Sequence, residues 1–288
     1  MTTDLRHATG SLPTAHRTVV MGVLNVTPDS FSDGGVALAS DGSVDRAVTV
    51  GLALRAAGAD CVDVGGESTR PGADPVPVDV ELERVVPVVT ALAAEGVVVS
   101  VDTRHTAVAR AALAAGASIV NDVGGLAPDD GMLDVVAAAG AGYVIMHLRG
   151  EPRTMQDDPR FVDVVAEVER ELLAARDAAV SAGVDAACLA LDPGIGFGKT
   201  LAHNIALLAA VRRLASHGAP LLVGTSRKSF LGALTGVERP SDRLAGSLSS
   251  AVLAARDGAR IVRVHDVAAT VEALAVQAAV DAAGGGRG

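Results

Sequence analysis

Short runs rich in Val, Ile and Leu alternate with longer Ala-rich segments along almost the entire chain. Eight apolar runs of strand character occupy residues 19–26, 61–66, 97–103, 118–123, 143–147, 188–193, 220–226 and 260–267. Segments of helical character lie between them, at residues 44–57, 80–95, 107–115, 162–182, 201–216 and 242–257. Several helical segments are followed by glycine, which accommodates the left-handed residue that ends a helix. Continuous apolar strands separated by helices predict a parallel sheet that is covered on both faces.

The number of strand–helix units indicates the architecture. Eight such units in 288 residues predict an α/β fold of the (β/α)₈ barrel type in a single domain. A doubly wound open sheet is the alternative, because it uses the same alternation of elements. No linker or change of composition divides the chain. We therefore expect a barrel over residues 17–282, a flexible N-terminal tail over residues 1–16 and a disordered C-terminal tail over residues 283–288.

Composition narrows the class of protein. Hydrophobic residues make up 49% of the chain and aromatic residues only 2%, so Ala, Val and Leu must build the core. The formal net charge is −10 and there is no block of Lys and Arg, which disfavours nucleic-acid binding. Cys61 and Cys188 each lie in an apolar run and are expected to be buried thiols in a reducing compartment. No run has the ~18 to 20 apolar residues of a membrane span and the N-terminus lacks a signal-peptide core, so we expect a soluble, cytoplasmic protein without membrane contacts.

Polar residues gather at the carboxyl ends of the predicted strands. Asn25, Asp102, Asn121 and Asp192 lie at the ends of the first, third, fourth and sixth runs. Each of them alone has a structural explanation, because Asn and Asp often form turns or cap helices. In a barrel, however, all strand ends meet at one face, where the loops after the strands build the active site. Together these residues therefore indicate a shared binding site.

The residue types favour a particular kind of ligand. Carboxylates and amides accept hydrogen bonds from a flat heterocycle that carries several N–H groups. A second, cationic zone contains Lys228, Arg263 and His265, with Asn25 nearby, and suits a phosphate or diphosphate with Mg²⁺. The segment DPGIGFGK (192–199) lacks the spacing of a nucleotide-binding loop, and we expect its glycines to allow close approach to the flat ligand. An aldolase that uses Lys228 as a Schiff-base amine remains an alternative.

Eight motifs together resemble the dihydropteroate synthases of folate biosynthesis. They are MGVLNVTPDSFSDGG (21–35), DVGGESTRPGA (63–73), SVDT (100–103), NDVGG (121–125), MHLRGEPRTMQ (146–156), LDPGIGFGK (191–199), GTSRKSF (224–230) and RVHDV (263–267). The resemblance covers almost the whole chain. It implies a (β/α)₈ TIM barrel, a homodimer, and a transferase that joins p-aminobenzoate to (7,8-dihydropterin-6-yl)methyl diphosphate, with Mg²⁺ present, and releases diphosphate. Sulfonamides resemble p-aminobenzoate and would compete for the same pocket.

The resemblance also implies roles for individual residues. For the pterin it implies Asp102, Asn121, Asp192, Lys228 and Met146. For the diphosphate it implies Asn25, Thr69, Arg263 and His265, with Asn25 also facing the metal. For p-aminobenzoate it implies Phe31, Arg70, Pro71, Phe197 and Ser229. The residues expected to act in the reaction are Asp102, Asp192, Lys228 and Asp33.

Some alternatives remain open beside this resemblance. A related pterin-binding methyltransferase barrel would leave the segments ESTRPGA (67–73) and SRKSF (226–230) without a role. A barrel that binds a pterin or a partner without turnover is also possible, although both segments are intact. Phe31 is expected to form an apolar wall for the arylamine, or else to anchor its own loop. His147 is expected to be structural, because an arylamine scarcely needs deprotonation before it attacks.

Overall fold

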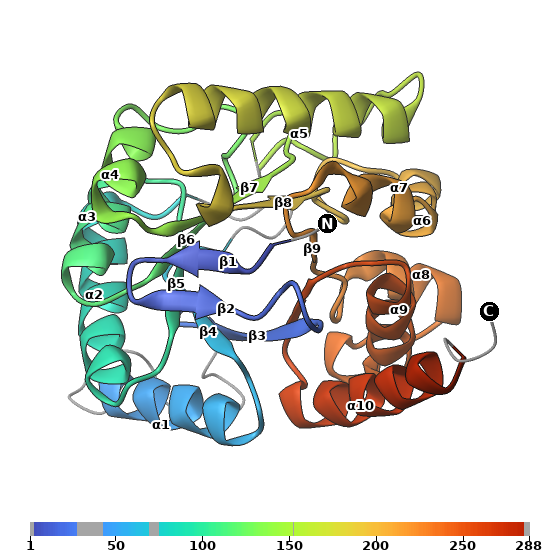
Figure 1. Ribbon diagram of the computed structural model, residues 1–288, viewed down its shortest axis with the longest axis horizontal. Helices are drawn as coiled ribbons and strands as arrows, with labels where there is room; N and C mark the ends of the chain where they lie inside the picture. The colour runs from blue at the N-terminus through green and yellow to red at the C-terminus, as the bar shows by residue number, and fades with distance from the viewer. Residues whose placement is uncertain (1–2, 28–42, 69–74, 152, 285–288) are drawn as a thin grey trace.

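Eight parallel strands form the centre of the structure. The computed structural model describes residues 3–27, 43–68, 75–151 and 153–284. The strands are β3 (Val19–Asn25), β4 (Cys61–Gly65), β5 (Val99–Asp102), β6 (Ile119–Asp122), β7 (Gly142–Met146), β8 (Leu189–Asp192), β9 (Leu222–Val223) and β10 (Ile261–Val264). Figure 1 shows these strands within a surrounding layer of helices. Seven lie inside the apolar runs that the sequence predicts as strands, and β7 begins one residue before its run.

The order of the strands shows that the sheet closes on itself. Neighbouring strands follow the order β8-β7-β6-β5-β4-β3-β10-β9, and the paired strands are parallel. The end strands β8 and β9 meet through a bridge between Leu191 and Leu221, and the Leu191 N–H donates to the Pro220 carbonyl at 3.0 Å. The predicted (β/α)₈ barrel is confirmed, and the open sheet is excluded because an open sheet has two unpaired edges.

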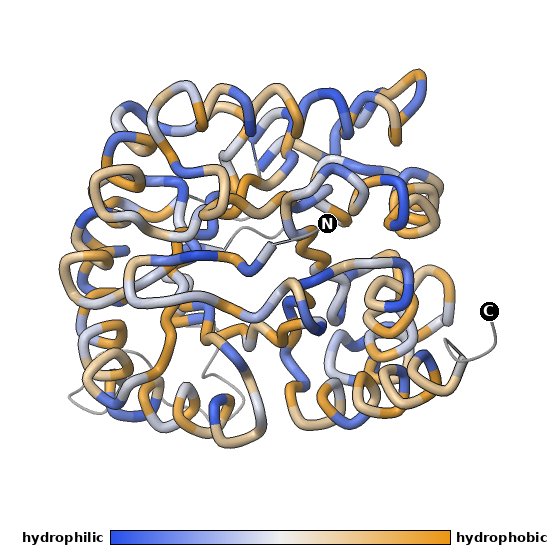
Figure 2. Tube along the Cα trace, viewed as in Figure 1, coloured by the Kyte–Doolittle hydropathy of each residue, from blue (hydrophilic) through white to orange (hydrophobic). Residues whose placement is uncertain are grey.

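Helices cover the outside of the barrel. They are α1 (Ser43–Ala56), α2 (Val78–Ala94), α3 (Thr106–Ala114), α4 (Met132–Ala139), α5 (Val164–Ser181), α6 (Leu201–Ala209), α7 (Val211–Leu214), α8 (Ser229–Thr235), α9 (Leu244–Arg256) and α10 (Val267–Gly284). Hydrophobic and hydrophilic residues alternate along them (Figure 2), as expected for helices that pack one face on a core. Val88 and Leu92 of α2 are fully buried in one cluster with Val62 and Val64 of β4. Because the strands are buried on both faces, their sequences are predominantly apolar.

The N-terminal segment differs from its prediction. Residues 5–12 belong to an antiparallel hairpin of β1 (Leu5–His7) and β2 (Gly10–Leu12), whereas we expected a flexible tail. Leu5 and Leu12 are buried in a cluster with residues from the first positions of the barrel strands, such as Val19 and Ile119. The hairpin therefore covers the end of the barrel where the strands begin. Two isolated leucines among polar residues give no periodic signal of burial, which explains the wrong prediction.

The helices agree with the sequence analysis less closely than the strands do. Helix α4 lies in a segment where the sequence analysis named no helix, and the single predicted helix at 201–216 is divided into α6, α7 and a 3₁₀ turn at Ala215–His217. Helix α10 continues to Gly284, and residues 285–288 of the expected C-terminal tail lie outside the described residues. No helix in the described part of the chain is long and apolar enough to cross a membrane.

Candidate active site

The carboxyl ends of the strands bring the predicted polar residues to one rim. Asp102 of β5 is the register partner of Asn121 of β6, and Met146 of β7 is the partner of Asp192 of β8. All four side chains are buried. Asn25 is partly buried at the end of β3. The structure therefore brings together residues that lie up to 167 positions apart (192 − 25 = 167), as the barrel prediction required.

An arginine between two carboxylates forms the centre of this rim. Arg263 Nε donates to Asp63 Oδ2 at 2.6 Å, and its Nη2 donates to Asp102 Oδ2 at 2.5 Å. Asn121 Nδ2 donates to the same Asp63 oxygen at 3.0 Å. Asp63 is fully buried, and the sequence analysis assigned it no role. Its position in the motif DVGG, two residues before the end of β4, was the available signal.

These contacts place Arg263 differently from the sequence analysis. We expected Arg263 at the diphosphate end and Asp102 in the heterocycle pocket, as two separate zones. Because the Arg263 guanidinium bonds directly to Asp102, the two zones share a wall. A guanidinium has five N–H donors, so these two bonds leave it able to contact a further anion.

Asp102 retains hydrogen-bonding capacity toward a ligand. Its Oδ1 is buried and accepts no hydrogen bond within the described part of the chain. Burial raises the pKa of Asp102 to about 7, with Arg263 opposing the shift and the charge of Asp63 adding to it. A buried carboxylate oxygen without a partner is costly. A ligand N–H group that donates to this oxygen would remove that cost.

Asp192 and Lys228 form the other side of the rim. Asp192 Oδ1 accepts a hydrogen bond from the Gly194 N–H at 2.7 Å. Burial raises the pKa of Asp192, while the charge of Lys228 opposes the shift. Lys228 Nζ donates to the Ile195 carbonyl and lies 4.5 Å from the centre of the Phe197 ring. Desolvation lowers the pKa of Lys228 to about 8, against the attraction of Asp192.

The segment that precedes Lys228 is held in a strained conformation. Arg227 is the one non-glycine residue with positive φ in the described part of the chain, at 61°. Its guanidinium makes two hydrogen bonds to Asp266, at 3.1 and 2.6 Å, and its carbonyl accepts one from Arg243 at 2.9 Å. In the same segment, Ser226 Oγ lies 3.1 Å from His265 Nδ1. These bonds fix both the lysine and the histidine at the rim.

The glycines of the DPGIGFGK segment allow close contacts within the protein. We expected them to allow close approach to a flat ligand. Gly194 has φ of +64°, and a Cβ there would lie 2.0 Å from the His147 carbonyl oxygen; Gly196 has φ of +89°, and a Cβ there would lie 2.8 Å from Lys228. The glycines therefore allow the loop to pack against the end of β7 and against Lys228.

A buried lysine that the sequence analysis missed anchors the end of this loop. Lys199 Nζ donates to the Phe197 carbonyl at 2.8 Å and lies 3.2 Å from His147 Nδ1. Burial lowers the pKa of Lys199 to about 7, and burial followed by the charge of Lys199 lowers the pKa of His147 to about 3. His147 Nε2 contacts Glu171, which Arg149 also binds. His147 is thus enclosed by protein groups, in agreement with the structural role expected for it.

Several predicted site residues cannot be placed. Phe31, Asp33, Thr69, Arg70 and Pro71 lie outside the described residues. Two residues predicted for the p-aminobenzoate pocket are described. Phe197 is partly buried beside Lys228, and Ser229 is exposed at the first position of α8.

Comparison with known proteins gives a consistent result. The family described as "Pterin binding enzyme" matches residues 21–265. The dihydropteroate synthase of Mycobacterium leprae is 52% identical over 263 residues, which cover 89% of this chain and 91% of that protein. The structure of Xanthomonas albilineans dihydropteroate synthase with 4-aminobenzoic acid has a TM-score of 0.89 at 50% identity and covers 97% of this chain and 99% of that one. The Burkholderia cenocepacia enzyme complexed with 7,8-dihydropteroate has a TM-score of 0.89 at 45% identity, with 99% of each chain covered.

The contact at Gly194 can be tested with a matched substitution. Gly218 also has positive φ, but a Cβ there would meet nothing within 4 Å. We expect Gly218→Ala to lower the free energy of unfolding by about 1–2 kcal/mol, the cost of the left-handed conformation alone. Gly194→Ala adds a clash with a backbone oxygen, so we expect at least about 2 kcal/mol more. Urea denaturation of both variants measures the difference, and equal losses would contradict the close contact.

Proposed function

The chain belongs to the pterin-binding enzyme family and, within it, to the dihydropteroate synthases, and from this membership we propose how its barrel rim carries out the reaction. The enzyme is a transferase of folate biosynthesis. It joins p-aminobenzoate to (7,8-dihydropterin-6-yl)methyl diphosphate and forms 7,8-dihydropteroate and diphosphate. The match to dihydropteroate synthases over 89% of the chain sets aside the aldolase and methyltransferase alternatives.

We propose that the pterin ring binds among Asp102, Asn121, Asp192, Lys228 and Met146. The observation that carries this assignment is the buried Oδ1 of Asp102, which has no partner among the described residues. A pterin supplies N–H donors for such an oxygen. Met146 is buried beside Asp192 and offers a polarisable side chain to pack on the ring.

The diphosphate is proposed to lie beside this pocket, next to Arg263 and His265, with Asn25 and Thr69. Arg263 supports the assignment because its guanidinium reaches the rim while bound to Asp63 and Asp102. Ser226 orients His265. The cationic side chains would balance the charge that builds up on diphosphate as its bond to carbon breaks.

Mg²⁺ is proposed to accompany the diphosphate. Asn25 offers an amide oxygen at the end of β3, and Mg²⁺ binds through few protein ligands while it retains waters and substrate phosphates. That donor chemistry fits an ion that arrives with the substrate. When bound, Mg²⁺ would neutralise negative charge on the diphosphate oxygens.

The p-aminobenzoate pocket is proposed to adjoin Lys228. Phe197 and Ser229 would form its fixed wall, and the ring of Phe197 already lies against the Lys228 ammonium. Phe31, Arg70 and Pro71, with Asp33, are proposed to complete it, although they lie outside the described residues. Sulfonamides, which share the aryl amine of p-aminobenzoate, would compete for this pocket.

The reaction is proposed to begin with departure of diphosphate. The C–O bond breaks, and its electron pair leaves with the diphosphate. The positive charge left on the pterin methylene group is delocalised into the ring, where Asp102 and Asp192 stabilise it electrostatically. The amine of p-aminobenzoate then forms the C–N bond and releases a proton. No side chain needs to act as a nucleophile.

Asp102→Asn tests the electrostatic role of the carboxylate. We expect turnover to fall by about 10²-fold or more, because the amide keeps the shape but loses the charge that stabilises the cation. Steady-state release of diphosphate is the measurement. Asp130→Asn is the matched control, since Asp130 is exposed and its substitution should leave turnover unchanged. Normal turnover in Asp102→Asn would remove Asp102 from the reaction.

The pH dependence of kcat/KM for the pterin substrate tests Lys228. Below about pH 7, Asp102 gains a proton and kcat/KM should fall; above about pH 8, Lys228 loses its proton and kcat/KM should fall again. In Lys228→Arg the guanidinium stays protonated, so the alkaline decline should move to higher pH. An alkaline decline at the same pH in wild type and variant would exclude Lys228 as its cause.

We propose that the protein is a homodimer that associates through α9 and α10. Leu253 of α9, and Val276 and Val280 of α10, are more than half exposed, and an exposed apolar patch often marks an interface. Light scattering should give about twice the 28.8 kDa chain mass. Leu253→Glu with Val276→Glu should give the monomer, whereas Val180→Glu on α5 should not. A monomeric wild type would contradict the proposal.

Cytoplasmic location and the absence of nucleic-acid and membrane partners are likewise proposed. The two buried thiols, Cys61 and Cys188, are unpaired, which supports a reducing compartment.

A further inference from the structure

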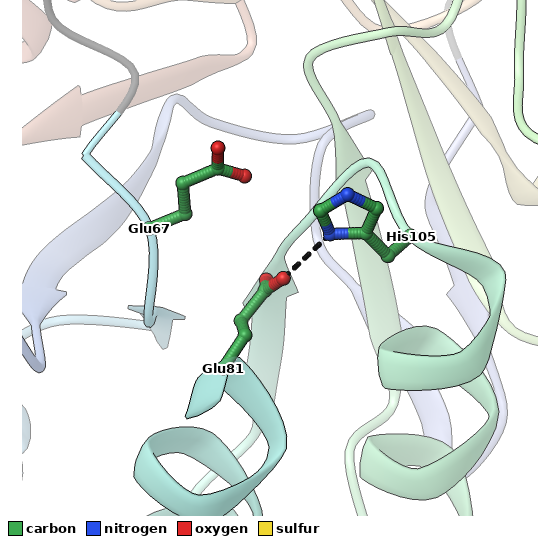
Figure 3. Close-up of side chains that lie close together, drawn as sticks. All are labelled: Glu67, Glu81 and His105. Carbon is green, nitrogen blue, oxygen red and sulfur yellow. Dashed lines mark hydrogen bonds and ion pairs between the residues drawn. The ribbon is translucent and has the colours of Figure 1, made fainter. Parts of the chain in front are cut away.

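Three side chains beside the active site converge on one point. Glu67 follows β4, Glu81 lies in the first turn of α2, and His105 precedes the first residue of α3. Figure 3 shows the three side chains pointing toward one another. One ligand atom of each lies within 4.8 Å of the other two. The reaction proposed above uses none of the three.

Glu81 is the unusual member of this group. Its side chain is fully buried, yet one of its oxygens, Oε1, accepts no hydrogen bond among the described residues. The other oxygen, Oε2, lies 2.7 Å from His105 Nδ1. An unpaired buried carboxylate oxygen is costly, and a cation at the point where the three side chains meet would supply the missing partner.

The local charges leave room for such a partner. The group contains two carboxylates, and Arg104 contacts one of them, Glu67. Its bonds to Glu67 are long, 3.2 and 3.3 Å, and 27% of its side chain is exposed. Arg104 can therefore turn into solvent and leave both Glu67 oxygens to another cation.

We propose that Glu67, Glu81 and His105 bind a divalent transition-metal ion, for which Zn²⁺ is the best match. Zn²⁺ accepts one imidazole nitrogen and two carboxylate oxygens, with water as the fourth ligand. Ligand atoms around Zn²⁺ stand about 3.3 Å apart, as follows from bonds of ~2.0 Å in a tetrahedron. The ligand atoms lie within 4.8 Å of one another and need only small movements to reach this spacing, with His105 Nδ1 and Glu81 Oε2, now 2.7 Å apart, moving slightly apart. Mg²⁺ prefers oxygen ligands, so the imidazole distinguishes this site from that of the diphosphate.

The ion would connect three elements of the rim. It would join the end of β4 to the beginnings of α2 and α3, in addition to the His105–Glu81 contact and the bonds from Arg104 to Glu67. It would also act on the active site. Burial, and after it the charges of Asp63 and Glu81, raise the pKa of Asp102. Neutralising Glu81 would therefore favour the ionised form of Asp102.

Calorimetric titration of the full-length protein with ZnCl₂, without substrate, tests the proposal. We expect one Zn²⁺ per chain at this site, bound at least about tenfold more weakly by His105→Gln and by Glu81→Gln. His16→Gln and Glu95→Gln are the matched controls, because both residues are exposed, and they should bind as the wild type does. Absence of binding, or equal binding by all four variants, would overturn the proposal.

Two further measurements distinguish loss of the metal site from loss of the fold in the variants. His105 is partly exposed, so His105→Gln should keep the wild-type circular dichroism; ZnCl₂ should raise the Tm of the wild type and leave that of His105→Gln unchanged. Anomalous scattering at the zinc edge from crystals soaked in ZnCl₂ should place the ion among the three side chains. An ion bound only elsewhere would refute the assignment. None of these measurements depends on catalysis, so failure here leaves the synthase reaction untouched.

Discussion

The ion pairs of Arg263 with Asp63 and Asp102 are the interaction on which the rest of the rim depends. They join β10 to β4 and β5 across the intervening strand β3. Burying three charges costs several kcal/mol per ion unless the geometry satisfies them, so these strands must be held rigidly in register. The barrel supplies that rigidity because it has no free edge. In return, the network fixes Asn121 through Asp63 and leaves one oxygen of Asp102 without a partner among the described residues.

Lys228 is positioned by a second set of constraints. Its ammonium contacts a backbone carbonyl and an aromatic face, while the preceding residue, Arg227, is held with positive φ by Asp266 and Arg243. A left-handed arginine is unfavourable by itself. The surrounding bonds therefore stabilise a conformation that the chain would not adopt locally, and that conformation places the lysine opposite Asp192. The glycines after Asp192 allow the facing loop to approach closely enough to complete the contact.

The rim thus presents two kinds of binding group. Arg263, Lys228 and His265 offer N–H groups to anions, whereas the proposed Glu67–Glu81–His105 site offers oxygen and nitrogen ligands to a metal. Both depend on burial, since carboxylates shielded from water bind cations or N–H groups more strongly than exposed ones do. Because the charge of Glu81 raises the pKa of Asp102, a cation bound at the proposed metal site would favour the ionised form of Asp102.

The sequence by itself determined the eight strands, the barrel and the residues at its rim. Strands buried on both faces are largely apolar, and polar residues such as Asp102 and Asp192 at their ends are then conspicuous. Only the tertiary structure decided how those residues pair. In the sequence, Asp63 was part of a predicted strand and Lys199 part of a predicted loop. Arg263 was predicted only as a diphosphate ligand. Residues 5–12 were predicted to be part of a flexible tail. Burial and hydrogen bonding between distant segments arise when the barrel closes, so no local pattern along the chain records them.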